Sequence, residues 1–228
     1  MNATDLLDQR DHVLLDFDGP VCSVFGGEIS NVRAADCLRS IVKGAVLPAE
    51  IANGPDPFAV LRFSAQFENG ARLADVAAEL ERLEREAVRT APPTVAIARV
   101  LDYLASAGHF VTIVSNNSAA AVADFLSRHG LERLARGIAA RRSADPSLLK
   151  PAPYLVEQAM ADASVTAQRC VLIGDSLADL QAAHAVSVPV IVYANKAGKR
   201  AWAEEHGAEA VIDSMAELVE TASATRER

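Results

Sequence analysis

The sequence has little of what marks several large classes of protein. Only three of its 228 residues are cysteines, and Cys22, Cys37 and Cys170 lie far apart. An odd, scattered set argues against a disulfide framework and against a zinc site, and it favours a reducing compartment. No apolar stretch approaches the roughly 18 residues that a membrane span requires. Residues 1–12 are polar and acidic, unlike a signal peptide. We therefore expect a cytoplasmic protein that does not enter a membrane.

Positive charge is also scarce. The formal net charge is −8, and the sequence contains no basic run. Nucleic acid is therefore not an expected partner. An acidic chain that binds an anionic substrate needs a local cation to do so. Half of the residues are hydrophobic, which is enough for a substantial core.

Short apolar segments alternate with helix-like ones along most of the chain. The predicted strands are 13–17, 110–115, 137–141, 170–174, 189–193 and 210–212, and the helices between them are 94–106, 119–129, 152–163 and 176–186. This alternation predicts an α/β fold, a three-layer Rossmann-like parallel sheet. Ligands of such sheets bind at the carboxyl ends of the strands.

Residues 22–90 interrupt this pattern. They lack strand signals, and residues 71–90 carry apolar side chains at three- and four-residue steps, which predicts an amphipathic helix. Residues 31–42 and 57–67 are also expected to be helical, with a loop at 53–57. We predict an α-helical insert after the first strand.

Two carboxylates, Asp16 and Asp18, follow the apolar run Val13–Leu15. Strand alternation would place both on one side, where like charges raise each other's pKa. A turn explains Asp18 and Gly19, because Asp-Gly is a turn dipeptide, but it leaves Asp16 unexplained. The pair predicts a metal site or an anionic reaction centre.

Three further clusters are informative only together. Ser115, Asn116 and Asn117 follow a predicted strand and could hold a phosphate oxygen, or could cap the next helix. Lys150 precedes Pro151 at an expected helix start and could neutralise a bound phosphate, or could be an ordinary solvated lysine. Asp175 ends another predicted strand, where a further carboxylate would complete an oxygen site for Mg²⁺. Asp179 has capping-box spacing from Ser176.

In this order the clusters resemble the motifs of the haloacid dehalogenase superfamily. Asp16–Gly19 matches its Asp-x-Asp-Gly, Ser115 its second-motif Ser or Thr, Lys150-Pro151 its third motif, and Gly174–Asp179 its Gly-Asp-Ser-x-x-Asp. The motifs span most of the chain. Residues 177–196 also look like the phosphoglycolate phosphatase-like branch. Pro20 departs from the usual Thr or Val but removes no catalytic side chain.

The spacing of the motifs places the insert. The gap from Asp18 to Ser115 is nearly three times as long as the gap from Ser115 to Lys150. A helical insert in the first gap is, in this superfamily, a C1 cap. We predict a core domain of residues 1–21 and 92–228 and a cap of residues 22–91, with hinges near 22–27 and 91–94.

The resemblance implies a Mg²⁺-dependent phosphatase acting on a small phosphorylated metabolite. Asp16 would be the nucleophile and Asp18 the general acid and base. Ser115 and Lys150 would bind the phosphoryl oxygens, and Asn116 is a further candidate substrate contact. Mg²⁺ would be held by Asp16, by Asp18 through its backbone carbonyl, by Asp175, and by Asp179 directly or through water.

Three other kinds of protein share some of these features. A phosphorylation-switched receiver domain is about half this size and has no helical insert. A sugar-phosphate phosphomutase of the same superfamily remains open, because the difference lies in cap contacts. A non-catalytic regulatory protein with this fold is less favoured, because every motif acid and base is present. The sequence leaves the substrate open, as well as the choice between monomer and dimer.

Overall fold

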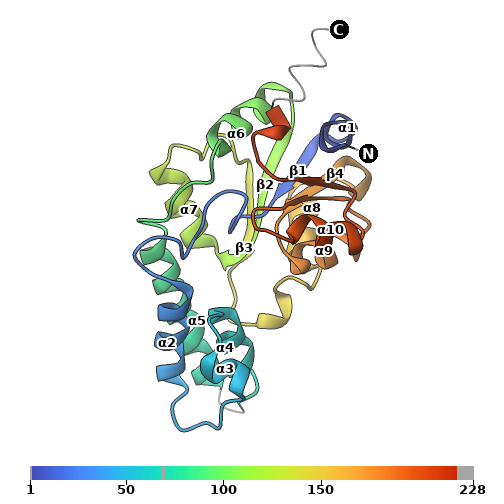
Figure 1. Cartoon of the computed structure of the whole chain (residues 1–228). Coiled ribbons are helices and arrows are strands. Elements are labelled where there is room, and N and C mark those ends of the chain that lie inside the picture. The colour runs from blue at the N-terminus through green and yellow to red at the C-terminus, as the bar shows by residue number, and fades with distance from the viewer. Residues whose placement is uncertain (1, 68–69, 220–228) are drawn as a thin grey trace.

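The computed structural model describes residues 2–67 and 70–219, and its centre is a six-stranded parallel sheet (Figure 1). The strand order is β3-β2-β1-β4-β5-β6. The strands are β1 (His12–Leu15), β2 (Phe110–Ser118), β3 (Gly137–Arg141), β4 (Cys170–Gly174), β5 (Val190–Tyr193) and β6 (Ala210–Ile212). The predicted parallel α/β fold is confirmed.

Strand β1 is central in the sheet and buried on both faces. Val13, Leu14 and Leu15 have no exposed surface. Val13 and Leu15 pack into one apolar cluster and Leu14 into the other, as strand alternation requires. The sheet therefore separates two cores, which makes the three layers.

Helices cover both faces of the sheet. The cluster that contains Val13 and Leu15 also contains apolar residues of α1 (Ala3–Asp8), α6 (Ile97–Ser106) and α7 (Ala119–Arg128). The cluster that contains Leu14 packs against α8 (Tyr154–Ala163), α9 (Leu177–His184) and α10 (Lys199–Glu205). Short 3₁₀ helices η1 (Pro146–Leu148) and η2 (Ala167–Arg169) precede α8 and β4.

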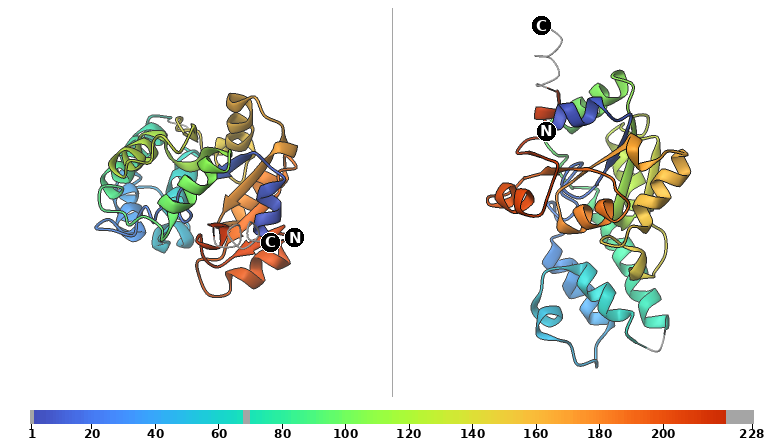
Figure 2. Two further views of the ribbon diagram at one scale, coloured as in Figure 1. Left: turned by 90° about the horizontal axis from the view of Figure 1, so that it is seen from above. Right: turned by 90° about the vertical axis from the view of Figure 1, so that its right-hand side faces the viewer.

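The insert is helical, as expected, and it follows β1. It contains α2 (Asn31–Ile41), α3 (Ala49–Asn53), α4 (Pro57–Ser64) and α5 (Gly70–Ala87), which we call the inserted helices. Figure 1 and the right-hand view of Figure 2 show them gathered at one end of the molecule, with α5 reaching strand β2 of the sheet. Their own apolar centre includes Leu38, Leu61 and Leu80, each without exposed surface. The domain boundaries given above stay a prediction.

Two chain segments join the inserted helices to the sheet domain, and they lie side by side. Ser23 donates a backbone hydrogen bond to the carbonyl of Pro92 (3.2 Å), and Thr94 donates one to the carbonyl of Val21 (2.9 Å). The predicted hinge regions are therefore paired with each other. Along the described ranges 2–67 and 70–219, no helix has both the length and the apolar character that a bilayer crossing needs.

Several element boundaries differ from the sequence expectation. The first strand ends at Leu15 rather than at residue 17, and α8 begins at Tyr154 rather than at residue 152. The second difference arises because Ala152 donates to the carbonyl of Leu149 (2.9 Å), so Pro151 lies in a turn and not at a first helical position. Helices α1, α3 and α10 were not expected, since five to seven residues carry little periodicity.

Candidate active site

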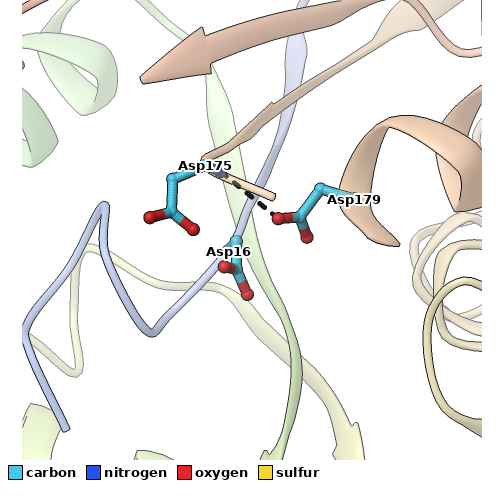
Figure 3. A group of neighbouring side chains, drawn as sticks. All are labelled: Asp16, Asp175 and Asp179. Atoms are coloured by element: carbon cyan, nitrogen blue, oxygen red, sulfur yellow. Dashed lines mark hydrogen bonds between the residues drawn. The ribbon is translucent and has the colours of Figure 1, made fainter. Parts of the chain in front are cut away.

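Three buried or half-buried carboxylates converge at the carboxyl end of the sheet. Asp16 directly follows β1, Asp175 directly follows β4, and Asp179 lies in the first turn of α9. One oxygen of each lies within 4.8 Å of the others, and the close-up shows the three side chains directed toward one space (Figure 3). The meeting of these ends follows from the register, in which Leu15 pairs with Ile173 across β1 and β4.

Lys150 supplies the positive charge of this cluster. Its Nζ donates to Asp16 Oδ1 (2.7 Å), to Asp179 Oδ1 (2.5 Å) and to the carbonyl oxygen of Val114 (2.9 Å). Its side chain is only 3% exposed. Burial alone would lower the pKa of Lys150, but Asp16 and Asp179 outweigh burial and raise that pKa above its ordinary value. The lysine is therefore a permanent cation, and the solvated alternative is wrong.

Burial shapes the chemistry of Asp16. Loss of water raises the pKa of its carboxyl well above the usual range, and Asp179 and Asp175 raise it further. Lys150 opposes both effects. A nucleophilic carboxylate must be ionised, so a cation beside Asp16 favours its reactive form.

Asp179 serves two purposes at once. Its Oδ2 accepts hydrogen bonds from the Ser176 hydroxyl (2.6 Å) and from the Ser176 backbone (3.1 Å), which completes the capping box of α9. Its Oδ1 faces Lys150. A Cβ on Gly174 would lie 2.6 Å from Asp179 Cβ and Cγ, so glycine is what allows this close approach.

Asp18 faces a different partner from Asp16. Its Oδ1 accepts from the backbone N–H of Val24 (2.9 Å), and its carboxylate is not among the three that converge in the described part of the chain. Its pKa is raised to about 6, as expected, but the main cause is burial, and the contributing carboxylates are Asp175 and Glu84. The expected mutual effect of Asp16 and Asp18 is thus wrong in cause, because β1 ends before strand alternation reaches Asp18. Gly19, with φ +118°, lets this turn pack against Asp175.

Ser115 lies where predicted, but it is not the cap of the next helix. Strand β2 continues to Ser118, whose hydroxyl accepts from Ala121 N (3.2 Å) and caps α7. The buried Ser115 hydroxyl accepts from the backbone N–H of Asn117 (3.1 Å) and lies 3.2 Å from Asn117 Oδ1. The register of β2 against β3 shifts here, and the irregularity turns Asn116 and Asn117 to different partners.

The side chain of Asn116 binds the backbone of Lys150. Its Nδ2 donates to the Lys150 carbonyl (3.0 Å), and its Oδ1 accepts from the Lys150 N–H (2.8 Å). The amide therefore fixes the segment that carries the lysine. A direct contact between Asn116 and substrate stays a prediction.

Four polar residues around the site were not among the predicted site residues. Glu84 of α5 and Arg141 of β3 form a buried ion pair (2.6 Å) behind Ser115. Lys199 Nζ lies 2.6 Å from Asp175 Oδ2, which also accepts from Asn195 Nδ2 (2.8 Å). Glu84 had a usable signal, since it stands among the buried apolar positions of α5. Lys199 had none, because α10 has seven residues and no motif.

A comparison with protein-family models found a match. A family model described as haloacid dehalogenase-like hydrolase matches residues 55–193, which is more than half of the chain. The match includes Ser115, Lys150, Asp175 and Asp179 and begins after Asp16 and Asp18. The search of curated proteins found no match.

Solved structures share the fold at low sequence identity. A predicted phosphatase from Clostridium acetobutylicum has a TM-score of 0.74 and 16% identity, with 94% of this chain and 99% of that chain covered. CbbY from Rhodobacter sphaeroides in complex with phosphate has a TM-score of 0.67 and 19% identity, with coverages of 92% and 96%. A predicted phosphoglycolate phosphatase from Haemophilus somnus has a TM-score of 0.68 and 13% identity, with coverages of 94% and 98%.

Proposed function

This chain belongs to the haloacid dehalogenase-like hydrolases, and on that premise we propose that it is a Mg²⁺-dependent phosphatase acting on a small phosphomonoester. The observation that carries the proposal is the convergence of Asp16, Asp175 and Asp179 around Lys150. A buried set of acids with one strongly held cation is costly unless it serves a charged reaction centre.

The carboxylate group fits a divalent cation. It offers only oxygen donors, within 4.8 Å of one another, and hard oxygen ligands are those that Mg²⁺ prefers. Asp16, Asp175 and Asp179, with the backbone carbonyl of Asp18, are the residues that would hold it. When bound, Mg²⁺ would neutralise negative charge on the phosphoryl group.

Asp16 is the proposed nucleophile. Its carboxylate oxygen attacks phosphorus, the bond from phosphorus to the ester oxygen breaks, and an aspartyl-phosphate forms. Lys150 favours the ionised carboxylate and attracts the phosphoryl oxygens, and Ser115 donates its hydroxyl to one of them. Lys150 would thus make a charge-assisted hydrogen bond to the transferred phosphoryl group, and Ser115 a neutral one.

Asp18 is the proposed general acid and base. With a pKa of about 6, its carboxyl can give a proton to the departing oxygen near neutral pH. The resulting carboxylate can then accept a proton from the water that cleaves the aspartyl-phosphate. The presence of this second acid favours phosphate esters over haloacids.

The proposed substrate is a small phosphorylated metabolite. Structures of CbbY, which has the same fold, contain phosphate or xylulose-(1,5)bisphosphate. Arg39 is an unsuitable cap contact for such a substrate, because its guanidinium donates to the carbonyls of Ile51 (3.0 Å) and Gly54 (2.8 Å). We propose that specificity comes from other residues of the inserted helices.

The test is phosphate release from a panel of phosphomonoesters, including p-nitrophenyl phosphate, with Mg²⁺ and with a chelator. We expect Mg²⁺-dependent release by the wild type and none by Asp16→Asn. Release that persists in the Asp16→Asn protein would refute the nucleophile assignment. No release from any ester would refute the phosphatase proposal.

A further inference from the structure

Glu84 and Arg141 form an ion pair that solvent does not reach. Glu84 has no exposed surface and Arg141 is 5% exposed. Arg141 donates through one terminal nitrogen to Glu84 Oε2 (2.6 Å). Burial raises the pKa of Glu84, and Arg141 opposes that rise. A buried pair of this kind contributes little net stability compared with apolar packing, so its position calls for another explanation.

Two chains of hydrogen bonds, which we call arms, start from this pair. The first arm runs from Glu84 through Asn117 to Ser115. Glu84 Oε1 accepts from Asn117 Nδ2 (3.2 Å), and Glu84 Oε2 accepts from the backbone N–H of Ser118 (2.9 Å). The Asn117 backbone N–H donates to Ser115 Oγ, and the Asn117 side-chain oxygen accepts the single hydroxyl proton, which must turn to a phosphoryl oxygen when phosphate binds. Because the Asn117 nitrogen is bound to the glutamate, its oxygen must face the serine.

The other arm leads to Lys150. Arg141 Nε donates to the backbone carbonyl of Asn116 (3.1 Å). The Asn116 amide then holds both the N–H and the carbonyl of Lys150. The ion pair is therefore connected, through Asn117 and Asn116, to the Ser115 hydroxyl and to the backbone of Lys150, the two residues whose side chains would contact the phosphoryl oxygens.

We propose that Glu84 and Arg141 are positioning residues that hold Ser115 and Lys150 in place for phosphoryl oxygens and tie that arrangement to the inserted helices. The inference rests on the proposed phosphatase function. Glu84 comes from α5, whereas its three partners, Asn117, Ser118 and Arg141, come from β2 and β3. The last turn of α5 is thus fixed to the sheet domain at the substrate end, so phosphate binding depends on the attachment of α5.

The substitution Glu84→Gln tests the arrangement with almost no change in volume. All partners of Glu84 are hydrogen-bond donors. A glutamine amide has one oxygen and one NH₂ group, so its NH₂ group would have to face other donors, either Asn117 Nδ2 or Arg141 with Ser118 N–H. We expect the dissociation constant for inorganic phosphate, measured calorimetrically with Mg²⁺ present, to rise by about tenfold or more. We expect kcat/KM for p-nitrophenyl phosphate to fall by a similar factor.

The neighbouring residue offers a matched control. Arg85 Nε lies 2.7 Å from Asp124 Oδ2 of α7, so this pair also ties α5 to the sheet domain, but it is about half exposed and touches neither arm. We expect Arg85→Gln to leave phosphate affinity within twofold of wild type. An equal loss in Arg85→Gln and Glu84→Gln would overturn the proposal, since general loosening of α5 would then explain both.

Asn117→Ala decides the matter if Glu84→Gln does not fold. It leaves the ion pair, the Ser118 contact and the backbone N–H donated to Ser115 intact, and it removes only the side-chain contacts to the Ser115 hydroxyl and to Glu84. The same weakening of phosphate binding is expected, with a urea midpoint near that of wild type. Wild-type affinity in Asn117→Ala and in folded Glu84→Gln would overturn the positioning role alone. A wild-type protein that neither binds phosphate nor releases it from esters would overturn the proposed function and this inference together.

Discussion

Replacement of Lys150 by methionine would remove the cation of the site while keeping most of its volume. The Nζ contacts two carboxylates, at 2.7 Å for Asp16 and 2.5 Å for Asp179, and the side chain is 3% exposed. At an effective dielectric constant of about 20, each contact corresponds to about 6 kcal/mol of attraction, against a desolvation cost of several kcal/mol per ion. Removing one partner of such a buried pair costs about 3–5 kcal/mol.

The free energy of unfolding is the quantity to measure. We expect Lys150→Met to lose about 3–5 kcal/mol in urea unfolding with a chelator present, at an unchanged dependence on urea concentration. Proton uptake by Asp16, whose pKa is already raised, limits the loss, so it should be larger at pH 8 than at pH 6. Phosphatase turnover should be lost, because Mg²⁺ alone would then face the phosphoryl charge.

Lys199→Met is the matched control. Lys199 also contacts a carboxylate of the cluster, at 2.6 Å from Asp175, but its side chain is 23% exposed. Screening by water limits its contribution to about 1 kcal/mol or less. A Lys150→Met protein as stable as wild type in chelator, or less destabilised than Lys199→Met, would refute the reasoning from burial and charge.

Three further changes probe the same site. Asp16→Asn should reduce turnover of p-nitrophenyl phosphate by roughly a thousandfold or more and keep the far-ultraviolet circular dichroism of wild type; appreciable turnover would contradict it. Between pH 3.8, its ordinary pKa, and about pH 6, Asp18 keeps a proton in the folded protein that it loses in the unfolded chain. Folding therefore becomes less favourable as the pH rises through that window. In chelator, the stability of Asp18→Asn relative to wild type should therefore increase by up to about 3 kcal/mol from pH 4 to pH 7, and a flat difference would argue against the raised pKa. Gly174→Ala places a Cβ 2.6 Å from Asp179, so the Mg²⁺ concentration for half-maximal activity should rise about tenfold; an unchanged value would show that the loop adapts.

The sheet and the central acids were predictable because each has a local signature. Runs of apolar residues ended in acids at Asp16 and Asp175, and parallel strands bring such ends together. Ser115 and Lys150 followed from the order of motifs. These features depend on a few consecutive residues, and a sequence displays those directly.

The remaining features depend on contacts between distant segments. Glu84 is 57 residues before Arg141 along the chain, and no local pattern pairs them. The partner of Asp18 was likewise out of reach, because its raised pKa comes mainly from burial in a turn whose packing the sequence does not reveal. Boundaries such as the start of α8 depended on a single turn at Pro151.

The central position of β1 has a consequence for biosynthesis. His12 pairs with Phe110 on one side and with Cys170 on the other, so the strand that carries Asp16 leaves the ribosome long before either neighbour exists. At about 5–20 residues per second, roughly 10–30 s separate the synthesis of β1 from that of β4. For the first roughly 5–20 s of that time, until β2 is made, Val13, Leu14 and Leu15 have no neighbouring strand, and such a segment is open to misassembly or to capture by chaperones. Assembly of the reaction centre must therefore wait until β4 and Asp179 have been made, long after the proposed nucleophile Asp16.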